Sequence, residues 1–155
     1  MAAASNRHND IALNLTTAIH RRLRGGPCKA GNSATKVRIR LTTNTRFYYP
    51  DAMIVCRPNK DEDTFQDEPT AIFEVLSEST RRAEEGEKRE SYLTIPTLRT
   101  YVMLESNSRT AIVFPRKANG IERTVLKKGD SIAIPEPDIQ IPLSEIYDGV
   151  SFEEV

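Results

Sequence analysis

The segment Ala71-Ile72-Phe73-Glu74-Val75-Leu76-Ser77 is apolar almost throughout, with one carboxylate in its middle. Such a run is typical of a central strand that is covered on both faces. A carboxylate inside it is costly to remove from water unless a partner compensates its charge. We therefore take this segment as the strand around which the fold is built, and Glu74 as the first candidate functional residue.

A second carboxylate, Asp51, opens another apolar run over residues 52–56. If the two runs form neighbouring strands, Asp51 and Glu74 can share one hard cation, because Mg²⁺ is usually held by one or two carboxylates together with phosphate and water oxygens. The alternative is structural, with a strand-end aspartate and a strand glutamate held by an arginine. The spacing alone leaves both interpretations open.

Periodic apolar residues predict further elements around these strands. Isoleucines and leucines at every fourth position from Ile11 to Leu23 predict an amphipathic helix that ends at Gly25-Gly26-Pro27. An alternating pattern predicts a strand over 37–41. We also expect a turn at Asn44-Thr45, a strand over 51–56, a helix from Ser79 or Thr80 to about Leu93, strands over 99–104, 109–114 and 132–134, and a proline-rich tail. This order predicts an α/β (α+β) fold, a mixed sheet flanked by helices, in a single domain over residues 1–155.

The helix expected over residues 81–93 is polar on almost every side, so it gains little by packing on a core. Its charges either pair along the surface, as Glu84 with Lys88, or one charged face points into a polar cleft beside the Glu74 strand. In the second case Lys88 and Tyr92 share a face with Glu84. The Lys88 ammonium can then stabilise the charge that develops on a phosphate.

Composition restricts the class of protein. The chain has 155 residues, of which 38% are hydrophobic and 28% charged, as in soluble globular domains. It has no apolar run of about 20 residues and no secretory signal, so we expect a cytoplasmic protein without membrane association. We expect Cys28 and Cys56 to be free thiols that pack as small apolar side chains. His8 and His20 lack ligand-like spacing, and we expect surface or packing roles for both.

The formal net charge is zero, but the first 50 residues hold nine lysines and arginines against one acid, Asp10. A phosphate-facing side explains this asymmetry, and so does a fold whose two halves neutralise each other by packing together. Under the first explanation, the candidate contacts to nucleic-acid phosphates are Arg21, Arg22, Arg38 and Arg40.

Several segments, taken together and in order, resemble the Uma-two family of restriction-endonuclease-like proteins, within the PD-(D/E)XK nuclease superfamily. The helix from His8 to Leu23 fits the family's first core helix. The residues that carry the resemblance are Tyr49-Pro50-Asp51, Glu68-Pro69, Phe73 to Thr80, Gly86-Glu87-Lys88, Tyr92, Ile95 to Val102, and Ile141 to Tyr147.

The resemblance implies a restriction-endonuclease-like fold with the site where two strands diverge. It implies Asp51 and Glu74 as metal-binding carboxylates. We expect the Val75 carbonyl to be a further ligand. The superfamily's lysine normally stands two residues after the second acid, where this chain has Leu76. In this family the following helix carries the lysine instead, which points to Lys88.

The chain departs from the family pattern in three places. Family members commonly begin with an extra segment that carries an acid, so a third acid is either missing here or supplied by Asp10. A glutamine often follows the strand after the catalytic helix, and here Glu105-Ser106 stand there. The acid expected shortly before the lysine is represented by Glu84 or Glu85.

The resemblance predicts a divalent-metal-dependent endonuclease that hydrolyses DNA, with Mg²⁺ or Mn²⁺ as its cofactor. A homodimer is expected by analogy with the fold. The alternative is a catalytically weak or inactive nuclease-fold module that binds nucleic acid or a protein partner. A third interpretation, a purely structural protein, would place Glu74 in a salt bridge with an arginine.

Overall fold

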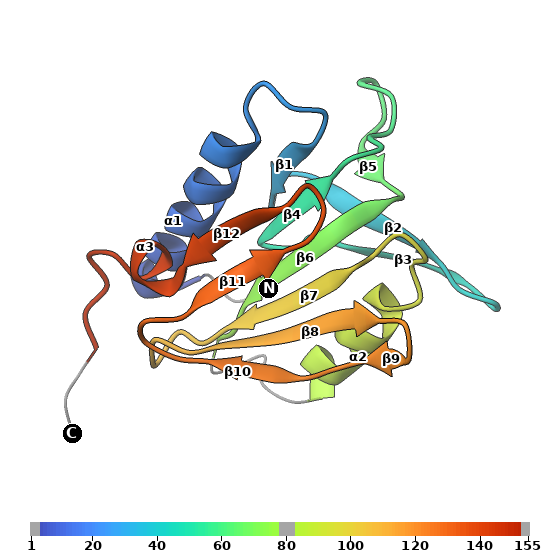
Figure 1. The fold of residues 1–155 in the computed structure, drawn as a ribbon. Coiled ribbons are helices and arrows are strands. Elements are labelled where there is room, and N and C mark those ends of the chain that lie inside the picture. The colour runs from blue at the N-terminus through green and yellow to red at the C-terminus, as the bar shows by residue number, and fades with distance from the viewer. Residues whose placement is uncertain (1–3, 78–82, 153–155) are drawn as a thin grey trace.

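A computed structural model describes residues 4–77 and 83–152, and these residues form a central mixed sheet (Figure 1). The strand order is β1-β4-β6-β7-β8-β10, and β9 pairs with β8 at one end. Strands β6 and β7 run parallel, whereas the other neighbouring pairs are antiparallel. The strands are β1 (Lys29–Asn32), β4 (Ala52–Val55), β6 (Pro69–Val75), β7 (Thr100–Leu104), β8 (Ala111–Lys117), β9 (Gly120–Ile121) and β10 (Thr124–Leu126). The predicted mixed sheet is confirmed.

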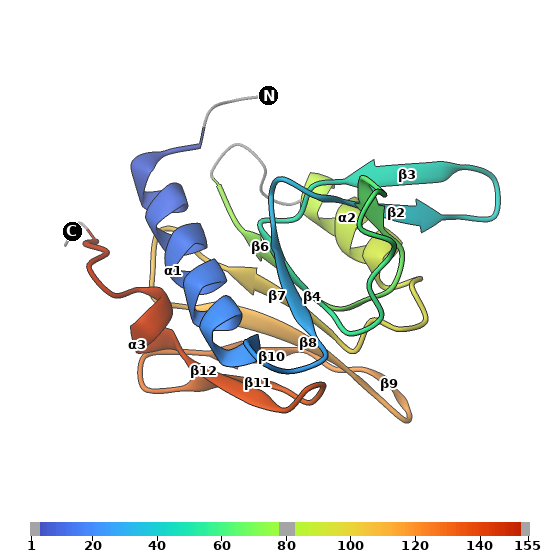
Figure 2. The ribbon, with the colours of Figure 1, turned by 90° about the horizontal axis from the view of Figure 1, so that it is seen from above.

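One face of this sheet is covered by α1 (Asn6–Leu23) and by the hairpin of β11 (Ser131–Ile134) and β12 (Ile139–Pro142), with α3 (Leu143–Ile146) beside them (Figure 2). The predicted amphipathic stripe of α1 is buried in this core. Ser5 caps the helix, because its side chain accepts a hydrogen bond from the backbone N–H of His8.

The opposite face is covered by α2 (Ala83–Tyr92) and by a second sheet with the order β3-β2-β5. This sheet comprises β2 (Lys36–Arg40), β3 (Thr45–Tyr48) and β5 (Phe65–Gln66). Alternating residues of β6 pack into the apolar cores on the two faces of the sheet. Phe73 packs towards α1, and Ile72 packs towards α2. Among the described residues, no helix is long and apolar enough to cross a membrane.

Two of the expected local structures are wrong. Thr45, expected in a turn, begins β3, whose short alternating pattern ends at Tyr48 and pairs with β2. The expected proline-rich tail contains β12 and α3, because Ile141, Leu143 and Ile146 are buried against the first core. The candidate helix caps Ser79 and Thr80 lie outside the described residues.

The expectation of two free thiols is also wrong, because Cys28 and Cys56 form a disulfide. Strands β1 and β4 pair antiparallel, with Lys29 opposite Val55. One position further along this register, Cys28 stands opposite Cys56. The sequence gives no sign that these two segments are adjacent, since β1 is only four residues long and weakly apolar.

Candidate active site

The register of the central sheet brings Asp51 and Glu74 together. Strands β4 and β6 pair antiparallel, with Ala52 opposite Phe73. One position beyond this pair, Asp51 stands across from Glu74. Side-chain alternation directs both residues to the face that α2 covers. The two apolar runs are therefore neighbouring strands, which is the condition for Asp51 and Glu74 to share a cation.

The Glu74 carboxyl group lies in a site that disfavours its charge. Its residue is only 5% exposed, at the end of a fully buried strand. Burial raises the pKa of Glu74 well above its ordinary value, and the nearby Asp51 carboxylate raises this pKa further. The Lys88 ammonium acts in the opposite direction and favours the ionised form. The site therefore brings together two carboxyl groups whose simultaneous ionisation requires a compensating cation.

Asp51 is held at the start of β4 by two contacts. Its Oδ2 atom accepts a hydrogen bond of 2.7 Å from the backbone N–H of Val75. The same oxygen lies 3.5 Å from Nε2 of His8, in the first turn of α1. The carboxylate is thus fixed between β6 and α1.

His8, for which the sequence predicts a surface or packing role, contacts the candidate metal ligand Asp51 instead. Its hydrogen bond with Asp51 raises the pKa of His8 above its ordinary value. The position of His8 near the beginning of a helix gives no indication of its partner, because the partner comes from a strand more than 40 residues later in the chain. His20, in contrast, is exposed, as expected.

Helix α2 presents Tyr92 and Lys88 to the carboxylates. Tyr92 is fully buried, and its hydroxyl donates a hydrogen bond of 3.4 Å to Oε1 of Glu74. Lys88 is half-buried, with its Nζ atom 5.8 Å from the centre of the Tyr48 ring. Tyr92 therefore lies on the face of α2 that meets the Glu74 strand, and Lys88 lies beside β3.

Glu85 is a further buried acid on the same helix. It is 6% exposed, and burial raises its pKa, whereas the nearby Lys88 ammonium lowers it. Its Oε2 atom is buried and has no hydrogen-bond partner among the described residues. The side chain of Glu84 lies outside the described part of the chain, and Asp10 is exposed on α1. Of the two accessory acids whose side chains are described, Glu85 is thus the buried one.

Comparisons with known proteins identify the family and the fold of the chain. A model of the Uma2 family, described as "Putative restriction endonuclease", matches residues 1–144. The chain belongs to the Uma2 family. An uncharacterised protein of Synechocystis sp. is 28% identical over 113 residues, which cover 68% of this chain and 60% of that relative. The chain thus spans less than two thirds of the length of this relative.

A solved structure shares the fold of this Uma2 protein. It is described as the crystal structure of "a putative nuclease belonging to DUF820" from Anabaena variabilis. The two structures superpose with a TM-score of 0.73 at 13% identity, over 94% of this chain and 83% of the other. The likeness establishes the fold, and the fold is the one that the sequence resemblance predicted.

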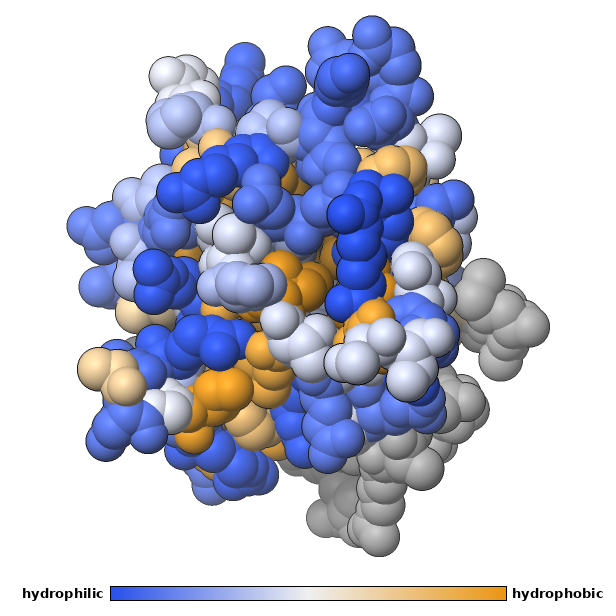
Figure 3. Space-filling view, turned by 90° about the vertical axis from the view of Figure 1, so that its right-hand side faces the viewer, coloured by the Kyte–Doolittle hydropathy of each residue, from blue (hydrophilic) through white to orange (hydrophobic). Residues whose placement is uncertain are grey.

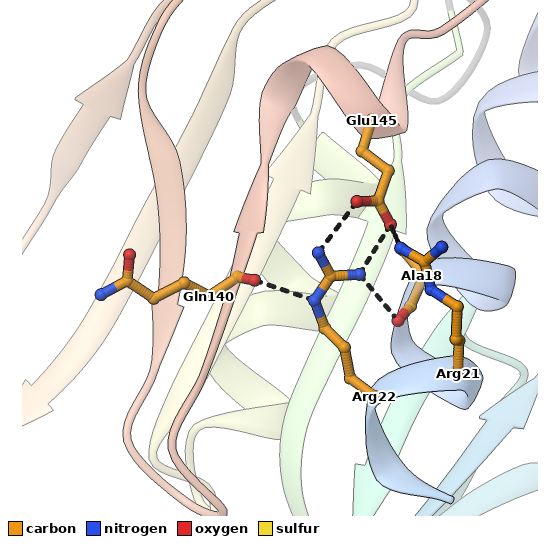
Figure 4. A network of polar contacts seen from close by, with 5 residues as sticks. All are labelled: Ala18, Arg21, Arg22, Gln140 and Glu145. Carbon is orange, nitrogen blue, oxygen red and sulfur yellow. Dashed lines mark hydrogen bonds and ion pairs between the residues drawn. The ribbon is translucent and has the colours of Figure 1, made fainter.

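Arg21 and Arg22, expected to contact nucleic acid, bind within the Uma2 protein itself (Figure 4). Arg22 makes a bidentate ion pair with Glu145 of α3, at 2.6 and 2.8 Å. Its Nε also donates to the Gln140 carbonyl at 2.9 Å. Arg21 donates to the same carboxylate at 3.0 Å. These contacts tie α1 to the C-terminal elements, and a phosphate contact by either arginine stays a prediction.

Arg38 and Arg40, the other two predicted phosphate contacts, differ in their surroundings. Arg38 makes a bidentate ion pair with Asp67, at 2.7 and 2.8 Å, and its guanidinium lies 4.1 Å from the centre of the Phe65 ring. Arg40 is exposed near the tip of the β2–β3 hairpin. Of these two side chains, Arg40 is therefore the one more accessible to a ligand.

Proposed function

We propose that this Uma2 chain is a divalent-metal-dependent endonuclease that hydrolyses phosphodiester bonds in DNA. The observation that carries the proposal is the placement of Asp51 opposite Glu74 on neighbouring strands, with Lys88 beside them. The family match and the nuclease-like fold support nuclease activity in general. Metal dependence and the choice of DNA are the steps that the proposal adds.

The candidate ligands suit a Mg²⁺ or Mn²⁺ ion that keeps several of its waters better than an ion that protein side chains enclose completely. Within residues 4–77 and 83–152, no group of three or more His, Cys, Asp or Glu side chains is arranged to hold a metal ion. Mg²⁺ commonly takes one or two carboxylates and keeps several waters, with substrate phosphates completing its shell. Asp51, Glu74 and the Val75 carbonyl fit that role. The unsatisfied Oε2 of Glu85 is an additional acceptor for the hydrogens of a hydrated cation.

Each residue then has a defined task. Asp51 and Glu74 would hold the ion, which when bound polarises the scissile phosphate and lowers the pKa of the attacking water. Lys88 would offset the negative charge that develops on the phosphate in the transition state. Tyr92 would fix the orientation of the Glu74 carboxyl group by its hydrogen bond. His8 would orient Asp51 from the side of α1.

A second candidate is a weak or inactive nuclease-fold module that binds nucleic acid or a protein partner. The His8–Asp51 contact favours it, because an imidazolium on Asp51 competes with a metal ion for the same oxygen. The two candidates predict different results in a cleavage assay that is combined with a binding assay.

The decisive experiment measures cleavage of supercoiled plasmid and of labelled duplex oligonucleotides with Mg²⁺, Mn²⁺ or Ca²⁺. We expect Mg²⁺- or Mn²⁺-dependent cleavage that falls by about 10²-fold or more in Asp51→Asn, Glu74→Gln and Lys88→Met, since each change removes a charge from the site. Glu90→Gln is the matched control, because Glu90 is exposed on α2. Unchanged cleavage in Glu74→Gln and Lys88→Met would overturn the proposal, and DNA binding without cleavage in any metal would select the second candidate.

A further inference from the structure

The β2–β3 hairpin has an outward face that carries both cations and aromatic rings. In its antiparallel register, Arg38 lies opposite Phe47. One position beyond the last pair, Lys36 stands opposite Tyr49, and Arg40 continues the same face towards the tip. Phe47 is 47% exposed and Tyr49 is 55% exposed, although large aromatic side chains are usually buried. The face therefore keeps two rings accessible to solvent.

This face stands on a hairpin that extends away from the body of the protein. The hairpin projects beyond the central sheet and α2 (Figure 2). The side of the molecule towards which it projects is largely hydrophilic, with apolar residues gathered in its middle (Figure 3). Tyr49 precedes Asp51 by only two residues. One end of this face is therefore close in the chain to the candidate active site.

The charge of the hairpin is positive throughout. The sequence has no acid between residues 11 and 50. The ammonium of Lys36 lies 5.3 Å from the centre of the Phe47 ring. Asp67 already neutralises Arg38, so the charge available to a ligand comes mainly from Lys36 and the exposed Arg40. Cations interleaved with exposed rings are the combination that single-stranded nucleic acids require.

We propose that this outward face binds single-stranded nucleic acid, with bases stacked on Phe47 and Tyr49 and phosphates held by Lys36 and Arg40. Alternate residues of a β-strand are about 7 Å apart, which is roughly twice the 3.4 Å spacing of successive nucleotides in one strand of a duplex. The face therefore suits an extended single strand of nucleic acid. A duplex turns its base faces inward and leaves the rings nothing to stack on. The proposal rests on the proposed function for its choice of a nucleic-acid ligand, and it makes single-stranded regions the preferred substrate.

A fluorescence experiment tests the stacking directly. The chain has no tryptophan, so Phe47→Trp and Tyr49→Trp each introduce a single reporter on this face. We expect a 20-nucleotide oligothymidine to quench both reporters in EDTA, where cleavage cannot occur. Leu13→Trp is the matched control, because Leu13 is 61% exposed on α1, across the central sheet from the hairpin. Absence of quenching in both hairpin variants would overturn the proposal.

Affinity measurements test the same face without a reporter. We expect the double variant Phe47→Ala and Tyr49→Ala to weaken oligothymidine binding at least tenfold in fluorescence anisotropy, and a 20-base-pair duplex to bind more weakly than the single strand. The conservative pair Phe47→Tyr and Tyr49→Phe should retain binding. Arg40→Ala should reduce the salt dependence of binding. The proposal would be overturned if the duplex bound as tightly as the single strand and the double alanine variant bound as tightly as the native chain. Sedimentation that shows the chain associating with itself through these rings would overturn it as well.

The outcomes separate this inference from the proposed function. Cleavage that depends on Asp51 and Lys88 but leaves the hairpin variants unaffected would overturn the single-strand inference and retain the nuclease. Quenching and ring-dependent binding without cleavage in any metal would retain the inference and overturn the nuclease.

Discussion

The Nε2 atom of His8 lies 3.5 Å from Oδ2 of Asp51, and both side chains are only 16% exposed. This contact joins the first turn of α1 to the beginning of β4, two segments that are far apart in the chain. The hydrogen bond with Asp51 raises the pKa of His8 above its ordinary value of 6.5. A basic group whose pKa is raised by folding stabilises the fold below its unfolded pKa. That contribution is lost as the pH rises through the folded pKa.

We therefore expect His8→Ala to lower the free energy of unfolding by about 1 kcal/mol at about pH 5.5, and by much less at about pH 9. Urea denaturation in EDTA at the two pH values measures the difference. His20→Ala is the control for helix propensity, because His20 is exposed on the same helix. An equal loss of stability at both pH values would show that the ion pair with Asp51 contributes nothing.

Glu74→Gln should stabilise the metal-free protein at neutral pH. Burial and the neighbouring Asp51 raise the pKa of Glu74, so the ionised form is disfavoured in the fold. The resulting loss of stability develops as the pH rises above the ordinary value of about 4.5. The advantage of the glutamine variant should therefore vanish below about pH 4.5. Thermal unfolding across this pH range measures it, with the exposed Glu90→Gln as the control.

Added Mn²⁺ should reverse that order of stability. A ligand present at about 100 times its Kd stabilises the folded protein by about 2.7 kcal/mol. We expect this shift in the native chain and a much smaller one in Glu74→Gln, measured as the change in Tm on metal addition. Equal shifts in both proteins would exclude Glu74 as a ligand, and this readout does not depend on catalytic activity.

The Arg22–Glu145 pair predicts the opposite pH dependence. Its hydrogen bonds hold the pKa of Glu145 below the ordinary value, so its stabilising effect is present above about pH 4.5 and is lost as the pH falls through the lowered pKa. We expect Glu145→Gln to cost about 1 kcal/mol at pH 7 and little near pH 3. Urea denaturation of Glu145→Gln, Arg22→Gln and the double variant gives the coupling energy, and a coupling near zero would contradict the assignment.

The sequence predicts the central elements well because their patterns are local. The i, i+4 stripe of α1 and the continuous apolar run of β6 each specify their own burial, and the family resemblance implies the mixed sheet that they join. The short strands β1, β3 and β5 were missed, since two to four residues carry too little periodicity. His8 belongs to the site only through a tertiary contact that no local pattern encodes.

The disulfide between Cys28 and Cys56 leads to a further prediction about stability. The bond joins residues 28 positions apart, next to the β1–β4 ladder that ends close to Asp51. In the chain-entropy description, closing a loop of this length stabilises the fold by roughly 3–4 kcal/mol. We therefore expect the double variant Cys28→Ala and Cys56→Ala to lose about that much in urea denaturation under oxidising conditions. Dithiothreitol should bring the native chain close to the variant while leaving the variant itself unchanged. Thiol titration of the unfolded native chain should detect two thiols after reduction and none before, and two thiols before reduction would show that the bond does not form.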